Sequence, residues 1–379
     1  MSQLSHHGMH QQPGMNAMKH RNSLQHECIG NFGRIFNNLP PLYVPPSILT
    51  ALGAPGGPMD GGTQSAFTET VPLGMVFLGQ FIDHDVTLDT SSGFDRINDP
   101  SAIENFRTPT LDLDCVFGEG PEDEPFLYET DSNRLLTGAT NQNTGQPTKL
   151  RIHDLPRNGQ GIAMIGDARN DENRIISQLQ LAFIRFYNAI YAAVEAQHPD
   201  YSPMEVYEVA RRDTTWHYQW VLVNEFLPLF VGKDLIDDIL GRGRRYYRPK
   251  QRPFIPVEFA VAAYRFGHSM VAQNVQLQKK GNILNLFSRK VGRGFSPITT
   301  KDQVVDWEMF FDMNSSFAAQ RAEKMDTKLA ATLLDLPFIR STNPADRSLA
   351  TRNLRRGQSF LLPSGESVAK FMARPENEI

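Results

Sequence analysis

Apolar side chains recur at three- and four-residue intervals from residue 175 to residue 194, and this periodicity limits the possible folds more than any other feature of the chain. It predicts an amphipathic helix with one buried face. Similar patterns predict helices at residues 72–85, 203–230, 258–273, 307–310 and 328–334. Strand patterns are few and short. The sequence therefore predicts a mainly α fold with long irregular loops and little β structure.

The stretches outside these helices suggest how the chain is divided. Residues 1–31 are rich in His, Gln, Met and Gly and predict a disordered N-terminal segment. Residues 32–62 and 90–167 are dense in turn-forming residues and predict irregular structure over a core. We expect residues 32–379 to form one helical domain. The members of the 203–230 helix expected mostly in the core are Met204, Val206, Trp216, Trp220 and Val223.

Composition excludes several classes of protein. The formal net charge is −4 over 379 residues, which disfavours a nucleic-acid binder or a polybasic membrane protein. No apolar run reaches the roughly 18 residues that span a bilayer, and no secretory signal is recognisable. Only Cys28 and Cys115 occur, so a disulfide framework is not expected. These features favour the cytoplasm, with non-classical export as the alternative, and leave the oligomeric state open.

Four polar side chains interrupt the apolar helix predicted at 72–85. Gln80, Asp83 and His84 are spaced i, i+3 and i+4, so they share one face, whereas Asp85 lies about 100° further round. Such groups are costly to bury without partners. The alternative interpretation is a helix end with solvated acids and one satisfied histidine.

Two further segments carry an arginine three residues from another functional group. In Gly166–Asn173, Arg169 and Glu172 share a face, although Asp and Asn here could simply cap the next helix. In Tyr264–His268, Arg265 precedes His268 by three positions, and Gly267 leaves space beside the histidine. This arrangement suits a flat ligand with an acidic group, whereas a core histidine is the alternative.

A fourth segment, residues 108–114, has oxygen-bearing side chains at every second position. In an extended chain all four would point the same way. Joined by another carboxylate they would suit calcium, which takes six to eight oxygen ligands. The alternative is an edge strand with a solvated face. The four residues are Thr108, Thr110, Asp112 and Asp114.

Taken together and in this order, the four segments resemble the animal haem peroxidase (cyclooxygenase–peroxidase, myeloperoxidase-like) superfamily over residues 72–356, as a short bacterial-type member. The resemblance implies a haem b cofactor, with distal catalytic residues above the haem and a proximal iron ligand below it. The implied distal residues are His84, Gln80 and Arg169, and the implied proximal iron ligand is His268.

The resemblance also implies supporting roles around the haem. Asp83 and Glu172 match the two carboxylates that can form ester bonds to haem methyl groups. Asn353 matches the asparagine that orients the proximal histidine. Arg265 and Arg356 resemble contacts to the haem propionates or the haem edge.

The fourth segment matches the calcium site of the family. The implied ligands are Asp85, Thr108, Thr110, Asp112 and Asp114, and the place of Thr110 can contribute a backbone carbonyl. Since His84 would face the haem and Asp85 the ion, we hypothesise that calcium locks the distal helix and that removing it loosens the haem pocket.

The implied function is reduction of hydrogen peroxide through a high-valent iron-oxo intermediate, with oxidation of small aromatic or halide donors, as in the response to oxidative stress. A neutral imidazole at His84 can take the peroxide proton and return it, and the Arg169 guanidinium can stabilise the charge on the leaving oxygen. The expected partners are hydrogen peroxide and a small reducing substrate. The alternatives are a fatty-acid dioxygenase of the same superfamily, or a haem- and calcium-binding interaction protein with weak turnover.

Three departures from the family pattern limit this interpretation. Asn173 stands where myeloperoxidase has a methionine linked to the haem, which makes chloride oxidation doubtful. Three residues before His268, where the oxygenases have a radical-bearing tyrosine, this chain has Arg265, and Tyr264 is one position off. The chain ends soon after Asn353, so we expect a domain without the usual C-terminal helices.

Overall fold

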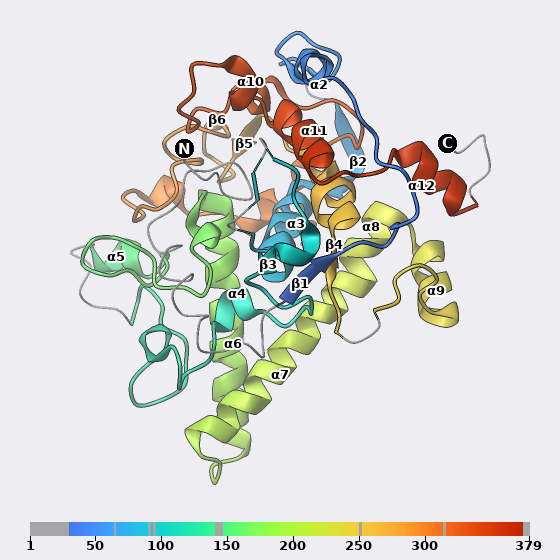
Figure 1. The fold of residues 1–379 in the computed structure, drawn as a ribbon. Coiled ribbons are helices and arrows are strands. Elements are labelled where there is room, and N and C mark those ends of the chain that lie inside the picture. The colour runs from blue at the N-terminus through green and yellow to red at the C-terminus, as the bar shows by residue number, and fades with distance from the viewer. Residues whose placement is uncertain are drawn as a thin grey trace.

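The computed structural model describes residues 30–373, apart from 64–65, 90–91, 94–95, 141–146, 250–251 and 314–315. The segment expected to be disordered, residues 1–31, lies outside the described residues except for its last two, which begin a strand. Helices dominate the described part, and this confirms the mainly α prediction (Figure 1).

The regular elements are as follows. The α-helices are α2 (Pro46–Gly53), α3 (Leu73–Val86), α4 (Asp114–Phe117), α5 (Thr148–Arg151), α6 (Arg174–Gln197), α7 (Pro203–Val221), α8 (Leu227–Val231), α9 (Lys233–Arg242), α10 (Pro344–Arg347), α11 (Leu349–Ser359) and α12 (Gly365–Phe371). The 3-10 turns are η1 (Pro100–Ala102), η2 (Pro125–Leu127), η3 (Ala168–Asp171), η6 (Ala263–His268), η7 (Lys301–Gln303), η8 (Trp307–Met309) and η9 (Ala331–Leu334). Two π-helical turns are η4 (Leu222–Phe226) and η5 (Glu258–Ala262).

Short strands form three small sheets. In the first, β1 lies between β3, to which it is antiparallel, and β4, to which it is parallel. The other two sheets are the antiparallel pairs β2–β7 and β5–β6. The strands are β1 (Gly30–Gly33), β2 (Phe67–Pro72), β3 (Glu104–Asn105), β4 (Ile255–Pro256), β5 (Asn274–Gln276), β6 (Ile283–Asn285) and β7 (Arg321–Glu323).

Helix α3 lies near the centre of the molecule (Figure 1). Pro72 precedes it, and twelve of its fourteen residues are buried, as expected for a helix that is apolar almost all round. The Phe81 ring stacks on Phe183 of α6 with centroids 4.6 Å apart. At the end of α3, Asn105 accepts from the Leu88 amide and donates to the Val86 carbonyl, which holds the chain where it leaves the helix.

Helices α6 and α7 lie side by side and extend to one end of the molecule (Figure 1). The predicted buried face of α7 is only partly correct. Val206 is buried, but Trp216 and Trp220 are 59% and 56% exposed. They lie on the outer face, away from the buried Tyr218, and the Arg212 guanidinium lies 4.8 Å from the Trp216 ring centroid. The prediction that Trp216 and Trp220 lie in the core, which rested on their large apolar side chains, is therefore wrong.

The segment at 258–273 is not the regular α-helix that its pattern predicts. A π turn, η5, passes into a 3-10 turn, η6, through Ala262, whose φ of −125° and ψ of −74° leave the helical range. The 3-10 turn ends at His268. Within the described part of the chain, no helix is both long and apolar enough to cross a bilayer.

Candidate active site

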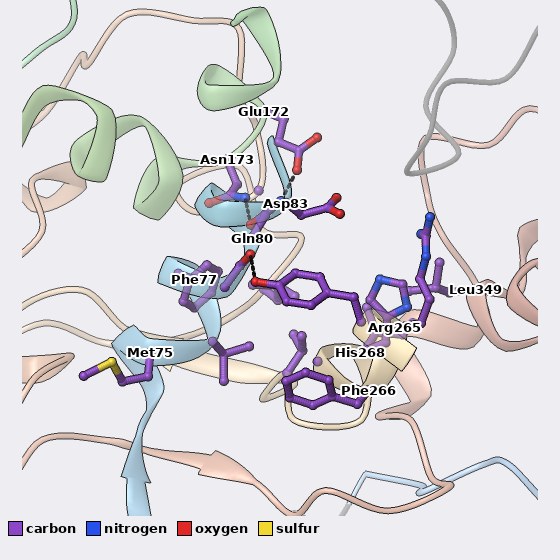
Figure 2. A pocket seen from close by; sticks show the side chains of 18 of the residues that line it. Met75, Phe77, Gln80, Asp83, Glu172, Asn173, Arg265, Phe266, His268 and Leu349 are labelled. Atoms are coloured by element: carbon purple, nitrogen blue, oxygen red, sulfur yellow. Dashed lines mark hydrogen bonds between the residues drawn. The ribbon is translucent and has the colours of Figure 1, made fainter. Parts of the chain in front are cut away.

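A cavity lies between α3, the start of α6 and the 258–268 turns. Figure 2 shows Gln80, Asp83 and Glu172 on one side of it and Arg265 and His268 on the other. Much of the remaining wall is apolar, with six phenylalanines among the lining residues. These are Phe77, Phe226, Phe230, Phe266, Phe287 and Phe338.

His84 is fully buried on α3, directly after the cavity-lining Asp83. Its Nδ1 lies 2.6 Å from Oδ1 of Asn170, a residue that the sequence interpretation did not single out. Its Nε2 lies 3.9 Å from Oε1 of Glu172. Glu172 lines the cavity and His84 does not, so the Glu172 carboxylate lies between the cavity and the His84 imidazole.

Arg169 is also buried, on η3, and does not line the cavity. Its guanidinium pairs with Asp167 at 2.7 Å and donates to the backbone carbonyls of His84 and Thr87 at 3.0 and 2.7 Å. Nη1 has no hydrogen-bond partner among the described residues. Arg169 therefore holds the end of α3 through these two carbonyls. Its Nη1 remains available as a hydrogen-bond donor within the described part of the chain.

Asp167 joins Arg169 to a second arginine. Arg107 pairs with it at 2.7 Å and also lies 3.7 Å from Asp114. Burial favours the neutral acid, but Arg169 and Arg107 hold the pKa of Asp167 well below its usual range. The sequence interpretation missed this link because Arg107 lies 60 positions before Asp167 and carries no local signal.

The remaining distal residues form a polar cluster at the cavity wall. Gln80 Nε2 donates to Glu172 Oε1, and Asn173 Nδ2 donates to Gln80 Oε1 at 3.3 Å (Figure 2). Asn173 also caps α6 by accepting from two backbone amides, so the expected capping role is confirmed. Asp83 lines the cavity and accepts from the Thr87 hydroxyl. The structure thus places Gln80, Asp83 and Glu172 at one cavity.

On the opposite side, His268 ends η6 and lines the cavity. Its Nδ1 lies 2.8 Å from the Asn353 amide on α11, 85 positions further along the chain. As placed, Asn353 Nδ2 can only donate, so Nδ1 accepts and a neutral imidazole carries its proton on Nε2. With the Asn353 amide turned over, Oδ1 would accept from Nδ1–H, and Nε2 would be the nitrogen that can bind a metal. Tyr264, one turn earlier, donates to the Gly79 carbonyl at 3.0 Å.

Two arginines lie near each other on the same side as His268, the half-buried Arg265 and the buried Arg356. Arg265 donates to the Ala260 carbonyl and lines the cavity, and Arg356 donates to Ser92 and lies 3.7 Å from Asp89. Burial and then Arg265 lower the pKa of Arg356 to about 10. Burial likewise lowers the pKa of Arg265. A buried cation whose pKa is lowered by burial and by a neighbouring cation fits a ligand that brings negative charge.

The predicted extended comb at 108–114 is wrong. The segment is irregular, because Leu113 has a φ of 61° and Asp114 starts α4. Its polar groups still converge: Thr108 and Thr110 donate to Asp112 at 2.8 and 2.9 Å. A left-handed residue turns the chain so that the carboxylates meet.

Three carboxylates meet beside α3. One oxygen from each of Asp85, Asp112 and Asp114 lies within 4.8 Å of the others. Both oxygens of Asp85 are buried without a hydrogen-bond partner in the described part of the chain. Burial and then Asp112 raise the pKa of Asp85 to about 7. Such a cluster is costly unless a proton or a cation neutralises it.

Comparisons with known proteins agree with this geometry. A model of the family described as "Animal haem peroxidase" matches residues 89–377. The chorion peroxidase of Aedes aegypti is 27% identical over 201 residues, which are 52% of this chain and 25% of that protein. The dual oxidase of Drosophila melanogaster is 27% identical over 53% of this chain and 13% of its own length. The chain thus spans a quarter or less of these two relatives.

Solved structures show the same fold. Peroxidase A from Dictyostelium discoideum has a TM-score of 0.64 at 16% identity, covering 92% of this chain and 75% of that one. The fatty acid alpha-dioxygenase of Arabidopsis thaliana has a TM-score of 0.55 at 14% identity, covering 96% of this chain and 70% of that one. At these identities the similarity establishes the fold alone.

Proposed function

The chain belongs to the animal haem peroxidase family, and we propose that it is a haem-dependent peroxidase that reduces hydrogen peroxide and oxidises a small aromatic donor. One observation carries this proposal. His268, engaged through Nδ1 by Asn353, lines the cavity opposite the wall that carries Asp83, Gln80 and, just behind it, His84. A metal ligand on one side and an acid–base imidazole on the other are what haem-dependent peroxide reduction requires.

The residues present fit a haem group. The cavity combines a mostly apolar lining with one imidazole, which suits a large, flat, apolar group that carries a metal. His268 would bind the iron through Nε2, and Arg265 and Arg356 would neutralise the propionates. Asp83 and Glu172 both line the cavity, and we propose that their carboxylates form ester bonds to the haem.

The haem would supply the electrons for peroxide reduction, whereas this chain's side chains would move the proton. Nδ1 of His84 is held by Asn170, so Nε2 is the nitrogen that can accept a proton from one peroxide oxygen. His84 then returns this proton to the other oxygen, which leaves as water. Arg169 Nη1 is a buried donor with no partner among the described residues and can stabilise the departing oxygen.

The donor is a small aromatic molecule in this proposal because phenylalanines line the cavity. A halide is the less favoured donor. Fatty-acid dioxygenation is the second candidate, favoured by the shared fold and the apolar lining. It ranks lower because Arg265 stands three residues before His268 and Tyr264 is bonded to the Gly79 carbonyl.

The proposal is tested by the absorption spectrum of the haem-loaded protein before and after one equivalent of hydrogen peroxide. We expect the Soret band to shift rapidly and to return when a phenol is added, with the oxidised phenol as product. Bleaching without phenol oxidation would indicate a haem-binding protein with little turnover. Oxygen uptake with palmitate, but no phenol oxidation, would favour the dioxygenase. Failure to take up haem would contradict both.

We also propose that Asp85, Asp112 and Asp114, with Thr108 and Thr110, bind calcium. Carboxylate and hydroxyl oxygens are ligands that calcium prefers. The bound ion would sit beside α3 through Asp85, one residue after His84, and so would hold the distal helix in place.

Calcium removal is expected to destabilise the protein more at pH 8 than at pH 5. The pKa of Asp85 is about 7 in the metal-free fold against 3.8 ordinarily, so the folded state binds more protons between these values. Stability therefore falls as pH rises through this window, by at most about 4 kcal/mol. Calcium should reverse the loss. Thermal unfolding at both pH values, with calcium or with a chelator, measures this.

Asp85→Asn provides the control, because it removes the charge and keeps the shape. In this variant the unfolding temperature should depend less on pH and should not respond to calcium. An equal response to calcium in the variant, or none in the natural chain, would count against the site.

A further inference from the structure

A line of buried side chains leads from His84 to a backbone carbonyl. His84 Nδ1 lies 2.6 Å from Asn170 Oδ1, and Asn170 Nδ2 donates to Gln180 Oε1 at 2.8 Å. Gln180 Nε2 donates in turn to the Cys115 carbonyl at 3.3 Å. His84, Asn170 and Gln180 are all fully buried. Elements α3, η3, α6 and α4 each contribute one member.

The carbonyl at the end of this line sets the direction of every hydrogen bond in it. A carbonyl can only accept, so the Gln180 amide must present Nε2 to Cys115 and Oε1 to Asn170. Asn170 must then donate through Nδ2, which leaves its Oδ1 facing His84. An amide oxygen cannot donate, so the proton between them belongs to His84 Nδ1.

We propose that Asn170 and Gln180 are positioning residues that hold His84 in the neutral tautomer with the proton on Nδ1, so that Nε2 is the base that takes the peroxide proton. This rests on the proposed function. The other tautomer would carry N–H at Nε2 and could not accept a proton there. The backbone of His84 is held separately by Arg169, so the amide pair acts on the ring.

An amide is suited to this task because it carries no charge. A carboxylate in the place of Asn170 would also accept from Nδ1, but its charge would favour the imidazolium, which cannot act as a base. The charged groups near His84 include Glu172, whose Oε1 lies 3.9 Å from Nε2, Arg169 on η3 and Asp167 just before η3. Asp83 and Asp85 flank it on α3. A neutral partner for Nδ1 fixes the proton's place without adding to these charges.

Three variants and one control test the proposal in the haem-loaded protein. Asn170→Leu and Gln180→Leu break the line at different points, and Asn170→Asp keeps an acceptor but adds charge. Gln178→Leu is the control, because Gln178 is a buried glutamine on the same helix whose amide donates to the His153 carbonyl, outside the line. The readouts are the rate of reaction with hydrogen peroxide between pH 4 and pH 9 and the imidazole ¹⁵N shifts.

The ¹⁵N shifts are recorded in the diamagnetic ferrous carbon-monoxide complex, with His84 identified by its loss in His84→Gln. In the natural chain, Nδ1 should show the shift of a protonated nitrogen and Nε2 that of an unprotonated one. In Asn170→Leu and Gln180→Leu the two shifts should move towards each other, and the peroxide rate should fall by about 10-fold to 100-fold. Gln178→Leu should change neither.

Asn170→Asp separates positioning from folding. It should keep the proton on Nδ1, yet raise the pH below which peroxide reactivity is lost by about 1–3 units. Unchanged ¹⁵N shifts and rates in Asn170→Leu and Gln180→Leu would overturn the proposal, as would equal losses in Gln178→Leu. If one leucine variant does not fold, the other and Asn170→Asp still decide. A natural chain with the expected tautomer but no peroxide reaction would instead refute the proposed function.

Discussion

Replacing His84 by leucine is expected to lower the rate of reaction with hydrogen peroxide by about 100-fold to 10,000-fold, the range that a positioned general acid–base contributes. The imidazole is the group held ready to take and return the peroxide proton, because its Nδ1 is bonded to Asn170. Stopped-flow measurement of the Soret change after mixing with peroxide gives the rate. Bound haem should be retained, since the proposed iron ligand is His268.

Two further variants serve as controls for this result. His84→Gln retains an amide that can donate to Asn170, so a similar loss of rate there would show that the fold is not the cause. His217→Leu removes an exposed histidine on α7 that contacts the Asp213 carbonyl and the Phe186 ring, away from the cavity, and should leave the rate unchanged. A loss smaller than about tenfold in both His84 variants would refute the role of this residue.

Replacing His268 by alanine is expected to abolish stable haem binding. His268 is the cavity-lining imidazole with its Nδ1 engaged by Asn353, and its removal takes away the proposed iron ligand itself. The loss of haem affinity should exceed the roughly 10-fold to 100-fold typical when only an outer partner of a metal ligand is lost. Haem titration followed by the Soret absorbance measures the affinity.

Asn353→Leu should fall within that smaller range, because it removes the outer partner and leaves the ligand. Added imidazole should partly restore the spectrum of His268→Ala by occupying the space left by the side chain. Unaltered haem affinity in His268→Ala would place the iron ligand elsewhere and would contradict the proposed arrangement of the cavity.

The helices were the most predictable part of the fold. α3 and α6 follow from apolar periodicity and from a proline or asparagine at their starts, and the structure places both as predicted. The break at Ala262 was not predictable, since the apolar pattern continues through it while the backbone changes from a π turn to a 3-10 turn. Trp216 shows the same limit, because periodicity identifies faces but not which large side chain stays outside.

At the candidate site, contacts between residues close in the sequence could be predicted, whereas contacts between residues far apart in the sequence could not. The shared face of Gln80 and Asp83 could be read from helical spacing, and both line the cavity. Asn170 was missed because its partner His84 lies 86 positions away, and the surrounding Asp and Asn residues read equally well as a helix cap. The convergence of three carboxylates was expected, but through an extended segment rather than the left-handed turn at Leu113.

The wide spacing of the site residues has a consequence for biosynthesis. His84 and Asn353 are separated by 269 positions (353 − 84). A ribosome that adds about 5–20 residues per second needs roughly 13–54 seconds to travel that far. For this interval the nascent chain carries the distal imidazole but lacks the asparagine that orients the proximal one. During this interval the proposed haem site lacks the outer partner of His268, so we expect haem to bind with full affinity only after residue 353 has been made.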